Sequence, residues 1–159
     1  MSQRIDYSKA APAVFKAFQA FSLAVKASSL DKGLLYLVDL RASQINGCVF
    51  CVDMHVKEAR LHGERELRLH HMAVWRESGL FSERERAAFE WTETLTRLDG
   101  RPVPDDAYAA ARAQFSEAEL TELTFAIMAI NGWNRIAIGF ASVPGSLDPV
   151  YGLDKAGLN

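Results

Sequence analysis

The chain has 159 residues, 49% of them hydrophobic and 24% charged, and its formal net charge at pH 7 is -2. This length suits one domain with its own apolar core, and the composition is that of an ordinary globular protein. The near-neutral charge leaves no electrostatic footprint for nucleic acid or an anionic membrane. We therefore expect a single domain over residues 1–159, with no nucleic-acid and no membrane partner.

The first ten residues contain Arg4, Asp6 and Lys9 and no apolar run typical of a signal peptide, and no later stretch is long enough to span a bilayer. These features predict a cytoplasmic protein. Its two cysteines are three positions apart. In a reducing compartment such a pair is more typical of a catalytic or metal-binding dithiol than of a structural disulfide, because the closed loop is short.

Apolar residues recur at helical spacing along most of the chain and no alternating stretch predicts a sheet, so the fold class is all-α, with about six to seven helices. The first helix begins near Pro12 and has one apolar stripe. The second covers residues 31–45, and the third runs from about Cys48 to Leu61. The predicted stripe of the first helix contains Val14, Phe18, Phe21 and Val25.

Capping-box spacings open two later helices, Ser82 with Glu85 and Ser116 with Glu119. A shorter helix is expected over residues 67–76, and another begins near residue 105 after two prolines. The tail, about 142–159, lacks periodicity and is expected to wrap irregularly over the surface or a neighbouring subunit. The helix after Ser82 should turn four apolar side chains inward, which are Ala88, Trp91, Leu95 and Leu98.

The chemically distinctive feature is the segment 48–55, in which Cys48, Cys51 and His55 follow a CxxCxxxH pattern. On a helix these positions share one face, and one helical turn brings the two cysteine Cα atoms to the separation that a disulfide needs. Unpaired amides at the helix start favour a thiolate there. The pattern therefore predicts a dithiol that opens and closes reversibly.

The spacing also predicts a division of roles. Cys51 is one turn from His55, so the imidazole can take its proton and stabilise the thiolate, which is the nucleophile. Cys48 would then resolve a Cys51 sulfenic acid, releasing water and forming the disulfide. A peroxidase of this kind needs a hydroperoxide substrate and a dithiol electron donor, but neither a cofactor nor a metal.

Three alternatives remain at this point. The dithiol could serve a non-catalytic redox sensor or assembly module, or the two thiols could simply be buried without function. Zinc binding would need further ligands, because no second CxxC or HxxxH pair is present and His62, His70 or His71 would have to fold back.

Residues 41–55, RASQINGCVFCVDMH, resemble the RxSQxNGCxxCxxxH signature of the alkylhydroperoxidase core family, which is related to the carboxymuconolactone decarboxylases. The segments around Trp75, 82–91 and 130–135 resemble the same family, so the similarity covers residues 5–140. It implies an AhpD-like helical fold that assembles into homotrimers or homohexamers. It also implies that Cys51 reacts with peroxide and that a lipoyl-bearing protein recycles the disulfide. Decarboxylase activity fits less well, because that branch lacks the cysteine pair.

One position departs from the family pattern. The family usually has a glutamate twelve residues before the first cysteine, where it serves a proton relay, and this chain has Tyr36 there. A phenol is a poor base at neutral pH, so we expect slower peroxide turnover than in glutamate-bearing relatives. Tyr36 could still donate a hydrogen bond in the pocket, and Asp39, one turn further along, could supply the carboxylate.

Overall fold

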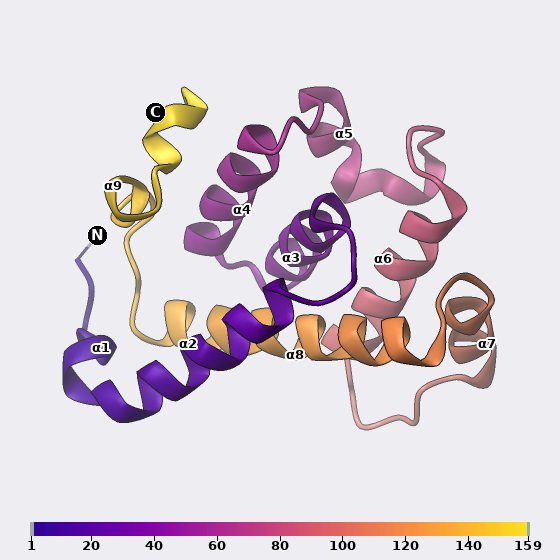
Figure 1. The fold of residues 1–159 in the computed structure, drawn as a ribbon, viewed down its shortest axis with the longest axis horizontal. Helices are drawn as coiled ribbons and strands as arrows, with labels where there is room; N and C mark the ends of the chain where they lie inside the picture. Colours follow the sequence, from indigo (N-terminus) through magenta and orange to yellow (C-terminus); the bar gives the residue numbers. More distant parts are fainter. Residues whose placement is uncertain (1, 159) are drawn as a thin grey trace.

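The structure is a computed structural model that describes residues 2–158. Within that range the chain forms nine α-helices and two 3-10 helices and no strand, so the predicted all-α class is confirmed (Figure 1). The elements are α1 (Tyr7–Ala10), α2 (Pro12–Lys26), α3 (Lys32–Asn46), α4 (Val49–Leu61), α5 (Glu66–His71), η1 (Met72–Glu77), α6 (Glu83–Thr96), α7 (Asp105–Gln114), α8 (Glu117–Gly139), α9 (Asp148–Tyr151) and η2 (Leu153–Ala156).

The helix count exceeds the predicted six to seven because of short elements. Helices α1 and α9 have four residues each, and α5 has six. Such pieces are too short to show a full apolar period, so periodicity cannot reveal them. The predicted helix over 67–76 also divides, since α5 passes into the 3-10 helix η1 at Met72.

Local capping explains where the principal helices begin and end. Both predicted capping boxes are present, at Ser82 with Glu85 and at Ser116 with Glu119. The side chain of Asp31 accepts a hydrogen bond from the Leu34 amide at the start of α3. These caps satisfy amides that a helix start leaves without partners inside the helix.

Helix α3 lies at the centre of the molecule, where it contacts α4, α6 and α8 (Figure 1). Its two sides support two apolar clusters. One cluster joins α3 to α6, α7 and α8, and the other joins α3 to α4, η1 and α6. Fully buried members include Val38, Leu123 and Ala88 in the first, and Leu37, Leu40, Met72 and Phe89 in the second.

A buried amide network fixes the end of α3 just before the cysteines. The Asn46 Nδ2 group donates to Asn131 Oδ1 at 3.0 Å and to Asn134 Oδ1 at 2.8 Å. Asn134, fully buried in α8, in turn donates to the Ser43 hydroxyl at 3.0 Å. Because a buried polar group without a partner is costly, this network sets the register of α3 against α8. Gly47 then turns the chain with a φ of 69°.

Three sequence-based expectations need correction. Of the stripe predicted on α2, Val14 is exposed whereas Phe18, Phe21 and Val25 are half-buried, because α2 lies along α8 at the edge of the molecule. Leu98 follows the end of α6 and is exposed, so it does not face the core. The tail is not irregular throughout: α9 and η2 form within it, and Leu153 is buried.

Across residues 2–158, no helix is both long enough and apolar enough to pass through a bilayer.

Candidate functional site

The cysteine pair lies at the start of α4. Helix α4 begins at Val49, so Cys48 is its N-cap residue and lies just before the helix where we expected its first turn; its sulfur accepts a hydrogen bond from the Cys51 amide at 3.3 Å. The two sulfurs form a disulfide, with the Cα atoms 5.3 Å apart. That separation lies inside the usual range of roughly 4.4–6.8 Å. The prediction that this pair can close is therefore confirmed.

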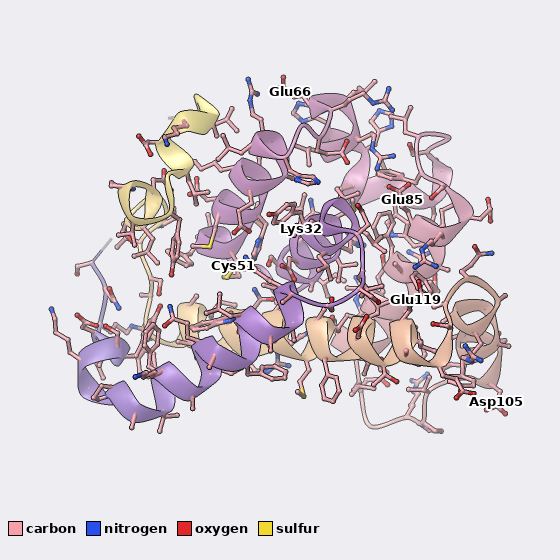
Figure 2. The ribbon with its side chains drawn as sticks, viewed as in Figure 1. Lys32, Cys51, Glu66, Glu85, Asp105 and Glu119 are labelled. Carbon is pink, nitrogen blue, oxygen red and sulfur yellow. A yellow bond between two sulfur atoms is a disulfide. The ribbon has the colours of Figure 1, made fainter. Side chains whose placement is uncertain are left out.

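The two sulfurs differ in what they face. Both cysteines are almost fully buried, at 2% and 3% exposure. A cavity of about 200 Å³ lies beside them, and Cys51 lines it whereas Cys48 does not. Figure 2 shows Cys51 in the turn of α4 that approaches α8. Cys48 and Cys51 both belong to one packed cluster with Ala137 of α8. Cys51 is therefore the sulfur that a molecule in the cavity would meet.

His55 lines the same cavity one helical turn after Cys51. Its Nδ1 atom lies 2.7 Å from Glu58 Oε2 and 3.9 Å from Asp39 Oδ2. Within residues 2–158 no hydrogen bond occupies the other ring nitrogen, Nε2. The second nitrogen is therefore available for proton exchange with Cys51 or with a bound molecule.

Glu58 is a site residue that the sequence reasoning missed. It lies three positions after His55 on the same face of α4, and Lys26 of α2 donates to its Oε1 at 3.0 Å. The i,i+3 spacing from His55 was the signal that could have revealed it. The pairing with Lys26 has no such signal, because 32 positions separate the two residues.

The charges around His55 shift one another's pKa values. Burial raises the pKa of Glu58, but the hydrogen bond with His55 and the charges of His55 and Lys26 outweigh burial and lower it to about 2. Burial lowers the pKa of His55, and the carboxylates of Asp39 and Glu58 together overcome that effect and raise it. The ring is thus favoured in its protonated form.

Asp39 has a different environment from Glu58. Burial raises its pKa to about 6, although the positive charges of His55 and Lys26 oppose this. None of the described residues donates a hydrogen bond to its side chain, and it lines the cavity. Because burial disfavours its charged form, the Asp39 carboxyl changes its protonation at a higher pH than an exposed aspartate does. The cavity therefore holds a titrating carboxyl beside the imidazole.

Tyr36 is not among the residues that line this cavity. Its ring packs against the cluster of Leu37 and Met72 and lies edge-on to His62, with ring centroids 5.4 Å apart. The expectation that Tyr36 lies in the pocket is therefore corrected by the structure. A relay role for the phenol stays a prediction.

The remaining histidines lie apart from the cysteines. His70 is exposed on α5, and His71 Nδ1 forms a hydrogen bond with the Ser78 hydroxyl at 3.0 Å. Within the described part of the chain, no group of three or more His, Cys, Asp or Glu side chains is arranged to hold a metal ion. The fold thus does not bring His62, His70 or His71 to the dithiol as zinc binding would require.

The remaining walls of the cavity are mostly apolar, with five aromatic side chains among them and with Gln19, Ser22 and Lys26 of α2 as polar members. They come from both ends of the chain as well as from α2, α4 and α8. Trp133 of α8 contributes one wall. Its indole N-H donates to the Ser22 hydroxyl at 2.8 Å, and its ring centroid lies 4.6 Å from that of Phe18. The aromatic residues of the lining are Tyr7, Phe15, Phe50, Trp133 and Tyr151.

Comparison with known proteins identifies the family to which this chain belongs. The sequence pattern of the carboxymuconolactone decarboxylase family matches residues 12–94. The uncharacterized protein YdfG of Bacillus subtilis is 37% identical over 142 residues, which cover 89% of this chain and 97% of YdfG.

Solved structures of related proteins have the same fold. A protein of unknown function from Agrobacterium tumefaciens, named as a candidate antioxidant defence protein AhpD, is 48% identical, with a TM-score of 0.87 over 90% of this chain and 98% of that one. A peroxidase-related protein of Ralstonia eutropha with an alkylhydroperoxidase AhpD core is 21% identical and shares the fold, with a TM-score of 0.77 over 87% and 74% of the two chains. The resemblance in residues 41–55 is thereby confirmed, and the chain belongs to the carboxymuconolactone decarboxylase family, with the fold of its AhpD-like members.

Proposed function

We propose that the protein is a thiol-dependent peroxidase that reduces hydroperoxides through reversible formation of the Cys48–Cys51 disulfide. One observation carries the proposal. The two sulfurs are close enough to bond, and the one that lines the cavity is Cys51, which shares that cavity with His55. A nucleophile, a resolving thiol and an acid-base group are the parts that this chemistry requires.

The cycle begins with both cysteines reduced. The Cys51 thiolate attacks the terminal peroxide oxygen, the O–O bond breaks, and the alkoxide leaves as an alcohol after taking a proton. Cys51 is then a sulfenic acid, and attack by the Cys48 thiolate forms the disulfide and releases water. The peroxide has gained two electrons, and the two thiols have supplied them.

His55 supplies the proton for the leaving oxygen. Its Nδ1 is held by Glu58 at 2.7 Å, so Nε2 is the nitrogen that exchanges protons. A protonated ring also stabilises the Cys51 thiolate before the attack. Asp39 and Glu58 serve here as the carboxylates beside the imidazole, in place of the glutamate that relatives have at position 36.

Turnover requires an external dithiol that reduces the disulfide by thiol exchange, and a lipoyl-bearing protein has the right chemistry. The cycle suits a reducing compartment such as the cytoplasm. Cys51 is the sulfur that we expect the donor to attack, because it lines the cavity and Cys48 does not.

Mass spectrometry of the cysteine peptides tests the proposal. Reduced protein is given one equivalent and then an excess of cumene hydroperoxide, with and without dihydrolipoamide as the donor. We expect multiple turnovers with the donor, a trapped Cys51 sulfenic acid in Cys48→Ser, and no reaction in Cys51→Ser. Consumption of a single equivalent even with the donor would instead identify a redox sensor, and sulfenic acid at Cys48 would reverse the assigned roles.

We also propose that the chain assembles with copies of itself, as a homotrimer or homohexamer. Apolar side chains exposed on α2 and α8 support this, because a soluble monomer rarely leaves a large apolar patch in water. Light scattering after size exclusion tests it, and a monomeric mass would contradict it. The exposed residues are Val14, Leu23, Phe125, Met128 and Ile138.

A further inference from the structure

The segment 143–156, which we call the C-terminal cover, forms part of the cavity wall. It lies outside the 12–94 region that matches the family pattern. Leu147 and Tyr151 of this cover line the cavity together with Cys51 and His55. Figure 1 shows α9, which carries Tyr151, at the same end of the molecule as α1, and η2 contacts α4.

A buried ion cluster fixes the cover to α4. Lys57 of α4 is almost fully buried, and its Nζ donates to Asp53 Oδ2 at 2.9 Å and to Asp148 Oδ2 at 2.6 Å. The amide of Gly145 donates to the same Asp53 oxygen at 3.0 Å. A buried charge persists only when it is paired and hydrogen-bonded, so these contacts hold the cover in one position. The burial of Leu153 and Ala156 adds apolar anchoring.

The cover faces the disulfide with apolar surface. Leu147 packs against the cluster that contains Cys48, Cys51 and Phe50. Tyr151 lines the cavity with half of its surface still exposed, so it stands at the border between cavity and solvent. Leu147 is a pure hydrocarbon side chain, and most of the Tyr151 side chain is an aromatic ring. Their contribution is apolar contact area.

Apolar contact area favours the binding of organic hydroperoxides over that of hydrogen peroxide. Hydrogen peroxide has no organic group and gains little from an apolar wall, whereas an organic hydroperoxide removes its hydrocarbon surface from water. An apolar cavity of about 150 Å³ accommodates benzene. The cavity here, about 200 Å³, therefore matches one aromatic ring or a short branched alkyl group.

We propose that Leu147 and Tyr151 determine specificity for organic hydroperoxides with a compact apolar group, and that Lys57 is the residue that positions the cover carrying them. The inference rests on the proposed peroxidase function for its chemistry. It assigns a role to a segment that lies outside the residues that match the family pattern.

The test compares the kcat/KM values for cumene hydroperoxide and hydrogen peroxide. In Leu147→Ala and in Tyr151→Ala we expect the ratio of the two values to fall about tenfold. Val150→Ala is the matched control, because Val150 is the adjacent residue on α9, is exposed and does not line the cavity; it should leave the ratio unchanged. Tyr151→Phe keeps the ring and should keep the ratio. An unaltered ratio in both alanine variants would overturn the proposal.

The positioning role of Lys57 is tested with two further variants. Lys57→Met should lower the same ratio mainly through a higher KM for cumene hydroperoxide, and Lys57→Arg, which keeps the charge, should restore part of it. Equal losses for the two peroxides in Lys57→Met would show a general structural defect and would overturn the positioning role.

A binding measurement separates this inference from the proposed function. Cumyl alcohol is the alcohol product of cumene hydroperoxide and cannot be reduced by a thiol. Titration calorimetry should show that it binds the wild-type protein and binds Leu147→Ala and Tyr151→Ala about tenfold more weakly. If the wild type reduces neither peroxide, the proposed function fails, while weakened alcohol binding in the variants still supports the assigned subsite. Undiminished binding in both variants would overturn the subsite whatever the turnover.

Discussion

Two glutamates of this protein, the buried Glu93 and the partly buried Glu58, have cationic neighbours but different surroundings. Glu93 of α6 accepts hydrogen bonds from Arg41 at 2.7 and 2.9 Å and from the Trp75 indole at 2.8 Å. Arg76 and Arg97 donate to its other oxygen at 2.9 and 3.2 Å. Among residues 2–158, the side chain of Glu58 on α4 pairs only with His55 and Lys26. The Glu93 carboxylate thus accepts hydrogen bonds from three arginines and an indole. The Glu58 carboxylate is instead paired with a histidine, whose charge changes with pH.

This difference indicates that the Glu93 network stabilises the fold, whereas the Glu58 network can change its protonation. Arginine stays protonated at any physiological pH, so the Glu93 cluster keeps one charge state and ties α3, η1 and α6 together. The pKa of His55 is raised by its carboxylate neighbours in spite of burial, and burial raises that of Asp39 to about 6. The group around Glu58 can therefore exchange protons, as the proposed peroxidase reaction requires beside the thiol.

The largest effect on stability is expected at the structural glutamate. Glu93→Ala leaves the buried guanidinium of Arg41 without its partner, which should lower the free energy of unfolding by about 3–5 kcal/mol. Glu90→Ala, which removes an exposed partner of Arg76, is the control and should change it by less than about 1 kcal/mol. Urea denaturation followed by circular dichroism measures both. Similar losses in the two variants would remove the distinction drawn for Glu93.

The largest effect on turnover is expected at the other glutamate. Glu58→Gln removes the charge that fixes Nδ1 of His55, so kcat/KM for peroxide should fall about 100-fold at pH 7. Its effect on unfolding should be smaller than that of Glu93→Ala, because Lys26 is half-exposed and can turn toward water. Glu66→Gln on the surface of α5 is a neutral control. Steady-state assays with a dithiol donor check the rate, and retention of full activity would refute a role for Glu58.

The pH profile tests the titrating carboxyl. Above pH 6 Asp39 is ionised and favours the protonated form of His55, which in the proposed mechanism stabilises the Cys51 thiolate. As pH falls through about 6, Asp39 takes a proton and this support is lost, so wild-type turnover should show an inflection there. Asp39→Asn should lack the inflection and should be about fivefold slower above it. An inflection near pH 6 that persists in Asp39→Asn would assign it to another group.

The smallest effect is expected at Tyr36. Its ring does not line the cavity, so Tyr36→Phe should change peroxide turnover by less than about twofold. A larger loss would show that the phenol takes part in the reaction. The slower turnover expected from the missing glutamate stays a prediction, which Tyr36→Glu checks: an unchanged rate would contradict it.

The sequence by itself determined the features that depend on neighbouring positions. Periodicity predicted the all-α class, and the capping boxes at Ser82 and Ser116 fixed two helix starts to the residue. The Cys48–Cys51 closure was also predictable, because two cysteines three positions apart at a helix start have their Cα atoms close together whatever surrounds them. Each of these rests on contacts that lie within a few residues of one another.

Only the tertiary structure decided what surrounds the dithiol. The Lys26–Glu58 pair joins residues 32 positions apart, and the Lys57–Asp148 pair joins residues 91 apart. Helical periodicity tells which face of a helix is apolar, but not which helix packs on it or at what angle. For that reason the aromatic cavity, the partners of His55 and the C-terminal cover could be described only from the assembled fold.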